Sequence, residues 1–246
     1  MTDAEISVVI PTYEDDPALA NLLLSLSFLD VAEIIVSDGV VREPPQNTLS
    51  NSGSIPLTYI PASRGRGSQI AAGIDQANQN TIWVLHTDSV PHTQSVAEIR
   101  RLLANQNITL GCFPLRFKDR SFWLKLFSVF SRFESALTTF GDQGYFFRLR
   151  NYKALDLNLC TYPLLEDVAL RSALKAKGKV RKSSLALTTS ARRFKKYGYL
   201  RTQVRNLNIL LRYKLGEHPA QLYRRYYGTI PQTAPTHPPS STAHPV

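Results

Sequence analysis

The first half of the chain alternates short apolar runs with stretches whose apolar residues recur at helical spacing. Apolar, β-branched runs predict strands over residues 6–10, 33–37, 57–60 and 81–85. Helical spacing predicts helices over residues 17–29 and 67–77. Strands that alternate with helices favour an α/β fold with a parallel sheet, and such sheets bind ligands at the carboxyl ends of their strands.

The second half is less regular. We predict strands over residues 108–116, 144–149 and 180–187, and helices over residues 122–137, 166–177, 199–215 and 219–227. The helix at 122–137 is strongly apolar, and we favour a core helix over the alternative of a lipid-contacting one. The last two helices are basic and amphipathic, whereas residues 229–246 are rich in proline and poor in large apolar side chains. We therefore expect a disordered tail there.

Charge is spread unevenly along the chain. The net charge is +10, yet residues 171–225 alone carry sixteen Lys and Arg against a single acid, Glu217. Such a stretch suits nucleic acid, an anionic membrane surface or a phosphorylated ligand, and a solvated basic face is the alternative. The two cysteines suggest no disulfide framework, and the sequence shows neither a signal peptide nor a membrane-spanning run. We therefore expect a cytoplasmic protein.

Polar residues that carry chemistry follow the predicted strands. Glu14, Asp38, Arg64 and Asp88 each lie near the end of a strand. A carboxylate such as Asp88 can bind Mg²⁺ or Mn²⁺ together with substrate phosphates, although an Asp after a strand is more often a turn or cap residue. Residues 63–67, Ser-Arg-Gly-Arg-Gly, precede a helix and suit either a phosphate or a plain solvated loop.

Two acids, Glu166 and Asp167, open a helix in the second half. Acids at this position commonly cap the helix or stabilise its dipole. A carboxylate there can also act as a general base that removes a proton from an attacking hydroxyl. The sequence alone leaves both interpretations open.

Six segments in order resemble the family 2 glycosyltransferases with the GT-A fold, and more narrowly the radical-SAM/selenodomain-associated transferases. They are SVVIPTYED, EIIVSDG, SRGRGSQIAAGI, WVLHTDS, GDQGYFF and PLLEDVAL, and the likeness runs from about residue 6 to about residue 227. The resemblance implies an α/β, Rossmann-like GT-A fold with a mostly parallel central sheet and a basic helical C-terminal extension. The expected parts are a catalytic domain at 1–190, the basic helices at 191–228 packed on or beside it, and the tail at 229–246.

The same resemblance implies roles for individual residues. The nucleotide-binding residues would be Pro11, Thr12, Tyr13, Glu14, Asp38, Arg64, Gly65, Arg66, Gly67, His86 and Thr87. Asp88 would be the metal ligand, with His86 in place of the first acid of the family's DxD motif. Asp142, Gln143 and Gly144 would border the acceptor, and Asp167, beside Glu166, would be the catalytic base. Arg192 and Arg193 are further candidates to meet the diphosphate.

The resemblance implies an inverting transfer of a single sugar, since the QxxRW motif of processive members is missing. The donor would be a UDP- or GDP-sugar bound with Mg²⁺ or Mn²⁺. The acceptor would be a hydroxyl or carboxyl group, and a lipid-linked molecule is among the options, as is peripheral contact with the anionic inner face of the cell membrane. Nucleic acid is not the expected partner. The alternatives are a nucleotidyltransferase and a catalytically degenerate protein that binds membrane or nucleic acid.

Overall fold

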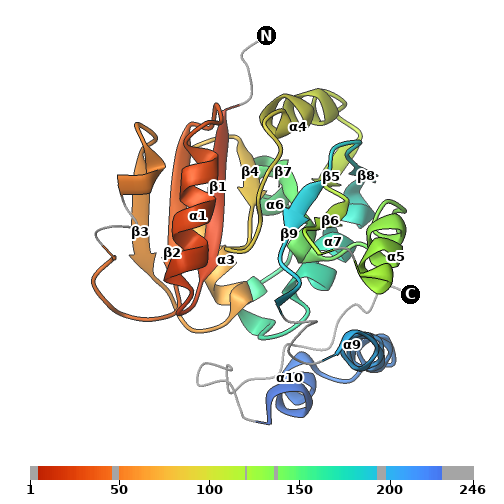
Figure 1. Cartoon of the computed structure of the whole chain (residues 1–246). Coiled ribbons are helices and arrows are strands. Elements are labelled where there is room, and N and C mark those ends of the chain that lie inside the picture. The colour runs from red at the N-terminus through yellow and green to blue at the C-terminus, as the bar shows by residue number, and fades with distance from the viewer. Residues whose placement is uncertain (1–4, 46–49, 120, 136–137, 193–197, 229–246) are drawn as a thin grey trace.

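A seven-stranded sheet forms the centre of the molecule (Figure 1). The computed structural model describes residues 5–45, 50–119, 121–135, 138–192 and 198–228. The strand order is β3-β2-β1-β4-β7-β5-β8. The strands are β1 (Ile6–Thr12), β2 (Glu33–Asp38), β3 (Leu57–Pro61), β4 (Thr81–Val84), β5 (Ile108–Cys112), β7 (Phe146–Arg148) and β8 (Lys179–Lys182). Within this sheet β7 runs antiparallel to both of its neighbours, so the prediction of an α/β fold with a mostly parallel sheet is confirmed.

Helices cover both faces of the sheet. The helices of the first part of the chain are α1 (Asp16–Leu26), α3 (Arg66–Asp75) and α4 (Ser95–Leu103). Those of the middle part are α6 (Leu149–Lys153) and α7 (Glu166–Lys177). Leucines of α1 and apolar residues of α4 pack on one face, and α3 and α7 pack on the other. The sequence analysis did not predict α4.

The predicted strand at 108–116 is divided in two. Its first part is β5, and its second part is β6 (Leu115–Phe117), which leaves the central sheet. The predicted strand at 180–187 is likewise divided, because β8 stays in the sheet while β9 (Leu187–Thr189) pairs with β6. The small β6-β9 sheet carries the chain over the carboxyl ends of the central strands, where Val90 bridges to Thr188.

The apolar helix α5 (Phe122–Phe130) lies on the surface, so the prediction of a core helix is wrong. Of its side chains only Leu124 is buried, and it ends earlier than predicted. Composition misled here because an apolar helix is buried only if another element covers it. Phe122, Trp123, Val129 and Phe130 are exposed instead.

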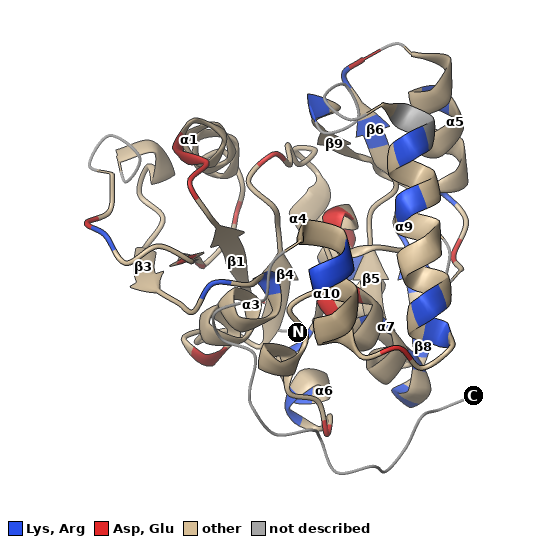
Figure 2. Ribbon diagram, turned by 90° about the horizontal axis from the view of Figure 1, so that it is seen from below, with Lys and Arg blue, Asp and Glu red and all other residues tan. Residues whose placement is uncertain are grey.

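The C-terminal helices pack on the segment that leads into α7. They are α9 (Tyr199–Lys214), which carries Arg and Lys, and α10 (Pro219–Tyr227), which carries Arg (Figure 2). Ile209 and Leu222 form a small buried cluster with Leu164. None of the described helices combines the length and the apolar character needed to cross a membrane. The predicted tail at 229–246 lies outside the described residues.

Candidate active site

One large cavity lies at the carboxyl ends of β1 and β4, with a volume of about 660 Å³. Ten of the predicted site residues line it: Pro11, Thr12, Tyr13, Arg66, His86, Thr87, Asp88, Asp142, Gln143 and Asp167. They come from five separate segments of the chain. The strand order explains the meeting, because β1 and β4 are adjacent and parallel and so present their ends side by side.

Asp38 lies outside the lining of this cavity, although it was predicted to contact the nucleotide base. Its side chain is fully buried at the end of β2. Val40 N and Arg42 Nε donate hydrogen bonds to its carboxylate at 3.0 and 2.9 Å, and the Tyr59 hydroxyl donates another. These hydrogen bonds hold the loop after β2 in place.

The glycine-rich loop at residues 64–67 has packing roles in the fold beside its predicted place at the nucleotide. A Cβ at Gly67 would lie 2.2 Å from the Leu159 carbonyl oxygen, so this glycine is needed for packing against residues 159–162. Gly65 has φ 132°, which a glycine adopts readily, and it precedes α3. The Arg64 guanidinium stacks over the Tyr13 ring at 4.5 Å from its centroid. Arg64 therefore reaches the site through Tyr13.

Three further predicted residues lie beside the cavity lining: Glu14, Gly144 and Glu166. Glu14 is exposed, with φ 49°, and the next residue, Asp15, takes its place in the cavity. Gly144 adopts φ 61°, which lets the chain turn sharply into β7. Glu166 lines a smaller pocket next to the main cavity.

Asp15 and Gln69 were not singled out from the sequence. Thr87 Oγ1 donates to Asp15 Oδ2 at 3.0 Å, and Arg192 Nη2 donates to the same oxygen at 2.9 Å. Asp15 thereby joins the end of β1 to the loops after β4 and β9. The Gln69 side chain donates to the carbonyl oxygens of Thr12 and Ser37, which ties α3 to two strand ends. The run of three acids at residues 14–16 is the sequence signal for this site. Only the fold of the turn shows that Asp15 is the acid that lines the cavity.

Asp88 sits at the strand end where a cation is expected. Burial raises the pKa of its carboxyl, while Arg192 and a 3.3 Å hydrogen bond from Thr189 Oγ1 oppose the rise. Within the described residues there is no group of three or more His, Cys, Asp or Glu side chains that could hold a metal ion. The donor set fits a cation that takes one carboxylate from the protein and its other oxygens from a diphosphate and water. Arg192 adds a second positive group there, whereas Arg193 lies outside the described residues.

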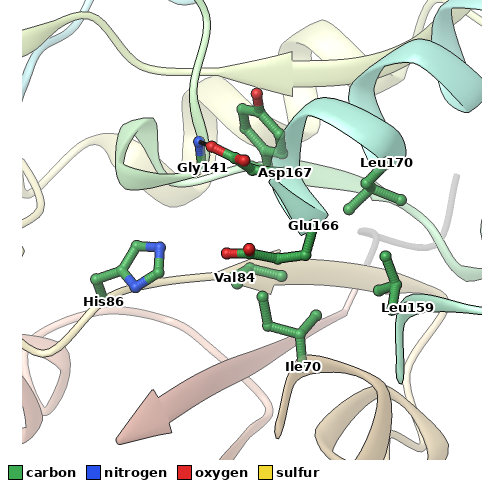
Figure 3. A pocket seen from close by; sticks show the side chains of 9 residues that line it. Ile70, Val84, His86, Gly141, Leu159, Glu166, Asp167 and Leu170 are labelled. Carbon is green, nitrogen blue, oxygen red and sulfur yellow. Dashed lines mark hydrogen bonds between the residues drawn. The ribbon is translucent and has the colours of Figure 1, made fainter. Parts of the chain in front are cut away.

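The carboxylate of Asp167 is held firmly at the start of α7. Gly141 N donates to Asp167 Oδ2 at 2.7 Å, and Val168 N donates to Asp167 Oδ1 at 2.9 Å. Figure 3 shows the carboxylate turned toward the Gly141 backbone. The close approach requires glycine, because a Cβ at position 141 would lie 2.7 Å from the Asp167 Cβ. Asp167 thus presents an oriented carboxylate to the cavity.

Glu166 is buried beside Asp167 and faces Arg66. Burial raises the pKa of its carboxyl to about 7, against the lowering effect of the Arg66 charge. The Arg66 Nε lies 3.1 Å from Glu166 Oε1, and in Figure 3 the Glu166 carboxylate points toward His86. The preceding residue, Leu165, has φ 65°, a left-handed conformation that costs a non-glycine residue about 1–2 kcal/mol. Backbone strain of this kind clusters at functional sites.

The far end of the cavity is mainly apolar, and the half-buried Lys182 holds the loop beside it. Its wall contains Leu115, Phe117, Phe127, Phe130, Phe140, Leu164, Leu165, Ile209, Leu210, Tyr226 and Tyr227. Lys182 Nζ donates to the carbonyl oxygens of Ser131 and Thr138 and to Gln143 Oε1 at 2.5, 2.7 and 2.8 Å. Burial lowers the pKa of Lys182 to about 8. Gln143 therefore helps to hold the loop that borders this end.

A family model described as "Glycosyl transferase family 2" matches residues 7–160, which is more than half of the chain. The chain belongs to glycosyl transferase family 2. The match takes in the ends of β1 and β4 and the Gly141 turn, and it stops before Asp167. A search of curated proteins found no match to this family 2 chain.

Solved structures share the GT-A fold of this family 2 chain. S. aureus TarS 1-349 superimposes with a TM-score of 0.61 at 13% identity, over 91% of this chain and 72% of that one. TarS 1-349 in complex with UDP-GlcNAc gives a TM-score of 0.60 at 14% identity, over 76% of this chain and 58% of that one. Glucosyl-3-phosphoglycerate synthase from Mycobacterium tuberculosis, in complex with Mn²⁺, UDP and glucosyl-3-phosphoglycerate, gives 0.55 at 16% identity, over 85% and 78%.

Proposed function

We propose that this family 2 chain transfers a single sugar from a nucleoside-diphosphate sugar to a hydroxyl or carboxyl acceptor, with inversion at the anomeric carbon. The observation that carries the proposal is the placement of Asp167. Its carboxylate is fixed by Gly141 N and lines the same cavity as Asp88. A base and a diphosphate-binding end in one cavity are the two parts that such a displacement needs.

We propose a UDP-sugar as the donor. The similar TarS and glucosyl-3-phosphoglycerate synthase structures contain UDP-GlcNAc, or UDP with Mn²⁺, and both share the fold of this chain. In this chain Tyr13, with Arg64 stacked on it, offers a face for the base. Likeness of the six segments further supports membership of the radical-SAM/selenodomain-associated subgroup.

In the proposed reaction Asp167 accepts the proton of the acceptor hydroxyl as the oxygen attacks the anomeric carbon. The bond from that carbon to the diphosphate oxygen breaks, and the nucleoside diphosphate leaves with the bonding electrons. Arg192, held by Asp15, places a positive charge near the departing diphosphate. A divalent cation bound at Asp88 would neutralise the charge that develops on the diphosphate. The carboxylate of Glu166, the residue before Asp167, forms an ion pair with Arg66.

The test has two parts. A thermal-shift panel of UDP-, GDP-, TDP- and CDP-sugars, each with and without Mn²⁺, selects the donor, because a ligand that binds the folded state raises Tm. Release of the nucleoside diphosphate from that donor is then measured for wild type and Asp167→Asn. We expect Asp167→Asn to lower turnover about 10²–10⁴-fold while the donor-induced rise in Tm persists. Near-normal turnover in Asp167→Asn would contradict the assignment of the base.

A further inference from the structure

The exposed face of α9 carries a continuous apolar stripe. Val204, Leu207, Leu211 and Leu215 follow one another at intervals of three or four residues, and their exposed fractions are 58%, 48%, 49% and 87%. Residues at this spacing share one face of a helix. The opposite face holds the buried Thr202, Ile209 and Leu210. The helix is therefore apolar on both faces, although packing within the chain uses one of them.

Basic side chains flank the stripe on both sides. At 100° per residue, Arg201 and Arg212 fall along one border of the stripe, and Lys214 falls along the other. Arg201 and Lys214 are exposed. Figure 2 shows Lys and Arg recurring along α9. An apolar stripe bordered by cations is the pattern of helices that lie in the headgroup region of anionic bilayers.

A second set of exposed apolar side chains lies on the same side of the molecule. Figures 1 and 2 both place α5 and α9 on the right. Phe122, Trp123, Val129 and Phe130 are exposed on α5, and Phe133 is exposed just beyond it. Single exposed apolar residues are common on protein surfaces, but a large exposed apolar patch marks a site that binds a protein, a ligand or a membrane. Aromatic side chains are especially suited to the membrane interface.

Exposed residues of α5 and α10 line the cavity. Phe130 of α5 and Tyr227 of α10 are exposed, and each also lines the cavity. Contact of α5 with a bilayer would therefore bring this end of the cavity to the lipid surface. Nucleic acid would also bind the basic side chains, but binding of nucleic acid would not explain the exposed stripe of Val and Leu.

We propose that α5 and α9 dock this protein on an anionic lipid bilayer, with the stripe at 204–215 and the exposed aromatic residues of α5 entering the headgroup region. Of the exposed apolar side chains on this surface only Phe130 lines the cavity, and none is given a role in the proposed transfer reaction, so docking can be tested without donor or acceptor.

Tryptophan fluorescence gives a direct measurement. The chain has two tryptophans, and Trp83 is fully buried whereas Trp123 lies exposed on α5. The full chain is mixed with vesicles of phosphatidylcholine alone, or of equimolar phosphatidylcholine and phosphatidylglycerol. We expect a blue shift and co-sedimentation with the anionic vesicles, both weakened by salt. No binding to the anionic vesicles, or equal binding to both kinds, would overturn the proposal.

Matched variants locate the surface. Leu207→Ser with Leu211→Ser should weaken vesicle binding by about fivefold for each leucine removed. Arg201→Gln with Lys214→Gln should weaken it by about fivefold for each charge removed at low salt. The control is Phe28→Ser, which removes a 77% exposed aromatic side chain just after α1. Equal losses in this control would overturn the assignment of the surface.

Two further measurements separate this proposal from its rivals. If the leucine pair is instead covered by a second copy of the chain, wild type sediments as a dimer without lipid and Leu207→Ser with Leu211→Ser sediments as a monomer. That result would overturn the bilayer proposal. Donor-induced stabilisation should be unchanged in the leucine variant, because neither leucine lines the cavity. If wild type binds no nucleotide-sugar donor but still binds anionic vesicles, the transferase proposal fails and the docking proposal stands.

Discussion

Gly141→Ala tests how the position of the proposed base is set. An added Cβ would lie 2.7 Å from the Asp167 Cβ, and an ordinary contact begins at 3.4 Å. The added Cβ meets the Cβ of Asp167, which is bonded directly to the α7 backbone. The contact therefore cannot be relieved by rotating the end of a side chain. Asp167 must therefore retreat by about 0.7 Å to reach that distance, and a misplacement of this order at a reacting group can cost about 10²-fold in rate.

The assay is release of the nucleoside diphosphate under saturating donor, with Tm measured in parallel. We expect Gly141→Ala to lower turnover about 10²-fold while donor binding persists, because Tyr13 and Asp88 lie on other segments of the cavity. Overpacking should also cost about 1–3 kcal/mol of unfolding free energy. The matched control is Gly178→Ala at the other end of α7, where a Cβ would lie 2.5 Å from Thr109 Cγ2 and outside the cavity.

The control should lose stability and keep its turnover at temperatures well below its Tm. Gly141→Ala with turnover within about threefold of wild type would refute the reasoning, since Asp167 would then tolerate the displacement. Equal losses of turnover in Gly141→Ala and Gly178→Ala would assign the effect to stability instead of to the position of the base.

Three further outcomes are expected. Asp88→Ala should abolish the Mn²⁺-dependent part of the donor-induced rise in Tm, and a rise that persists in full would place the cation elsewhere. Lys182→Met removes three hydrogen bonds and should lower unfolding free energy by about 3 kcal/mol in urea titrations, whereas an unchanged midpoint would show that the loop is held by other contacts. Burial raises the pKa of Glu166 from 4.5 to about 7, so wild type should lose stability as pH rises from 4.5 through 7, by about 3 kcal/mol. Glu166→Gln should flatten that dependence, and an unchanged slope between pH 5 and pH 8 would contradict the shift.

The sequence was sufficient to predict the first half of the fold. Strands β1 to β4 are short apolar runs bounded by polar residues, and their alternation with helices implies parallel pairing. Parallel pairing in turn brings Thr12 and Tyr13 beside His86, Thr87 and Asp88. Local pattern and topology agree there, which is why seven of the ten predicted residues that line the cavity come from the first half of the chain.

The rest depends on contacts between distant segments. Phe113 and Pro114 separate β5 from β6, and β9, the strand that pairs with β6, lies more than seventy residues later in the chain. The exposure of α5 reflects the lack of a covering element, which no local pattern encodes. Gly67 and Gly141 look like flexible loop residues in the sequence, yet each is required because another backbone or side chain approaches it closely.

Leu164 packs against Ile209 and Leu222 only three residues before Asp167, so the C-terminal helices and the carboxylate share one small core. A fragment that ends just after Arg192 would keep both covered faces of the sheet and the ends of β1 and β4, but it would lose this core. Such a fragment should therefore be a donor-binding protein with a poorly held base. For protein engineering, residues 198–228 are not an exchangeable module. Grafting them from another protein would alter the acceptor end of the cavity and the alignment of the base together.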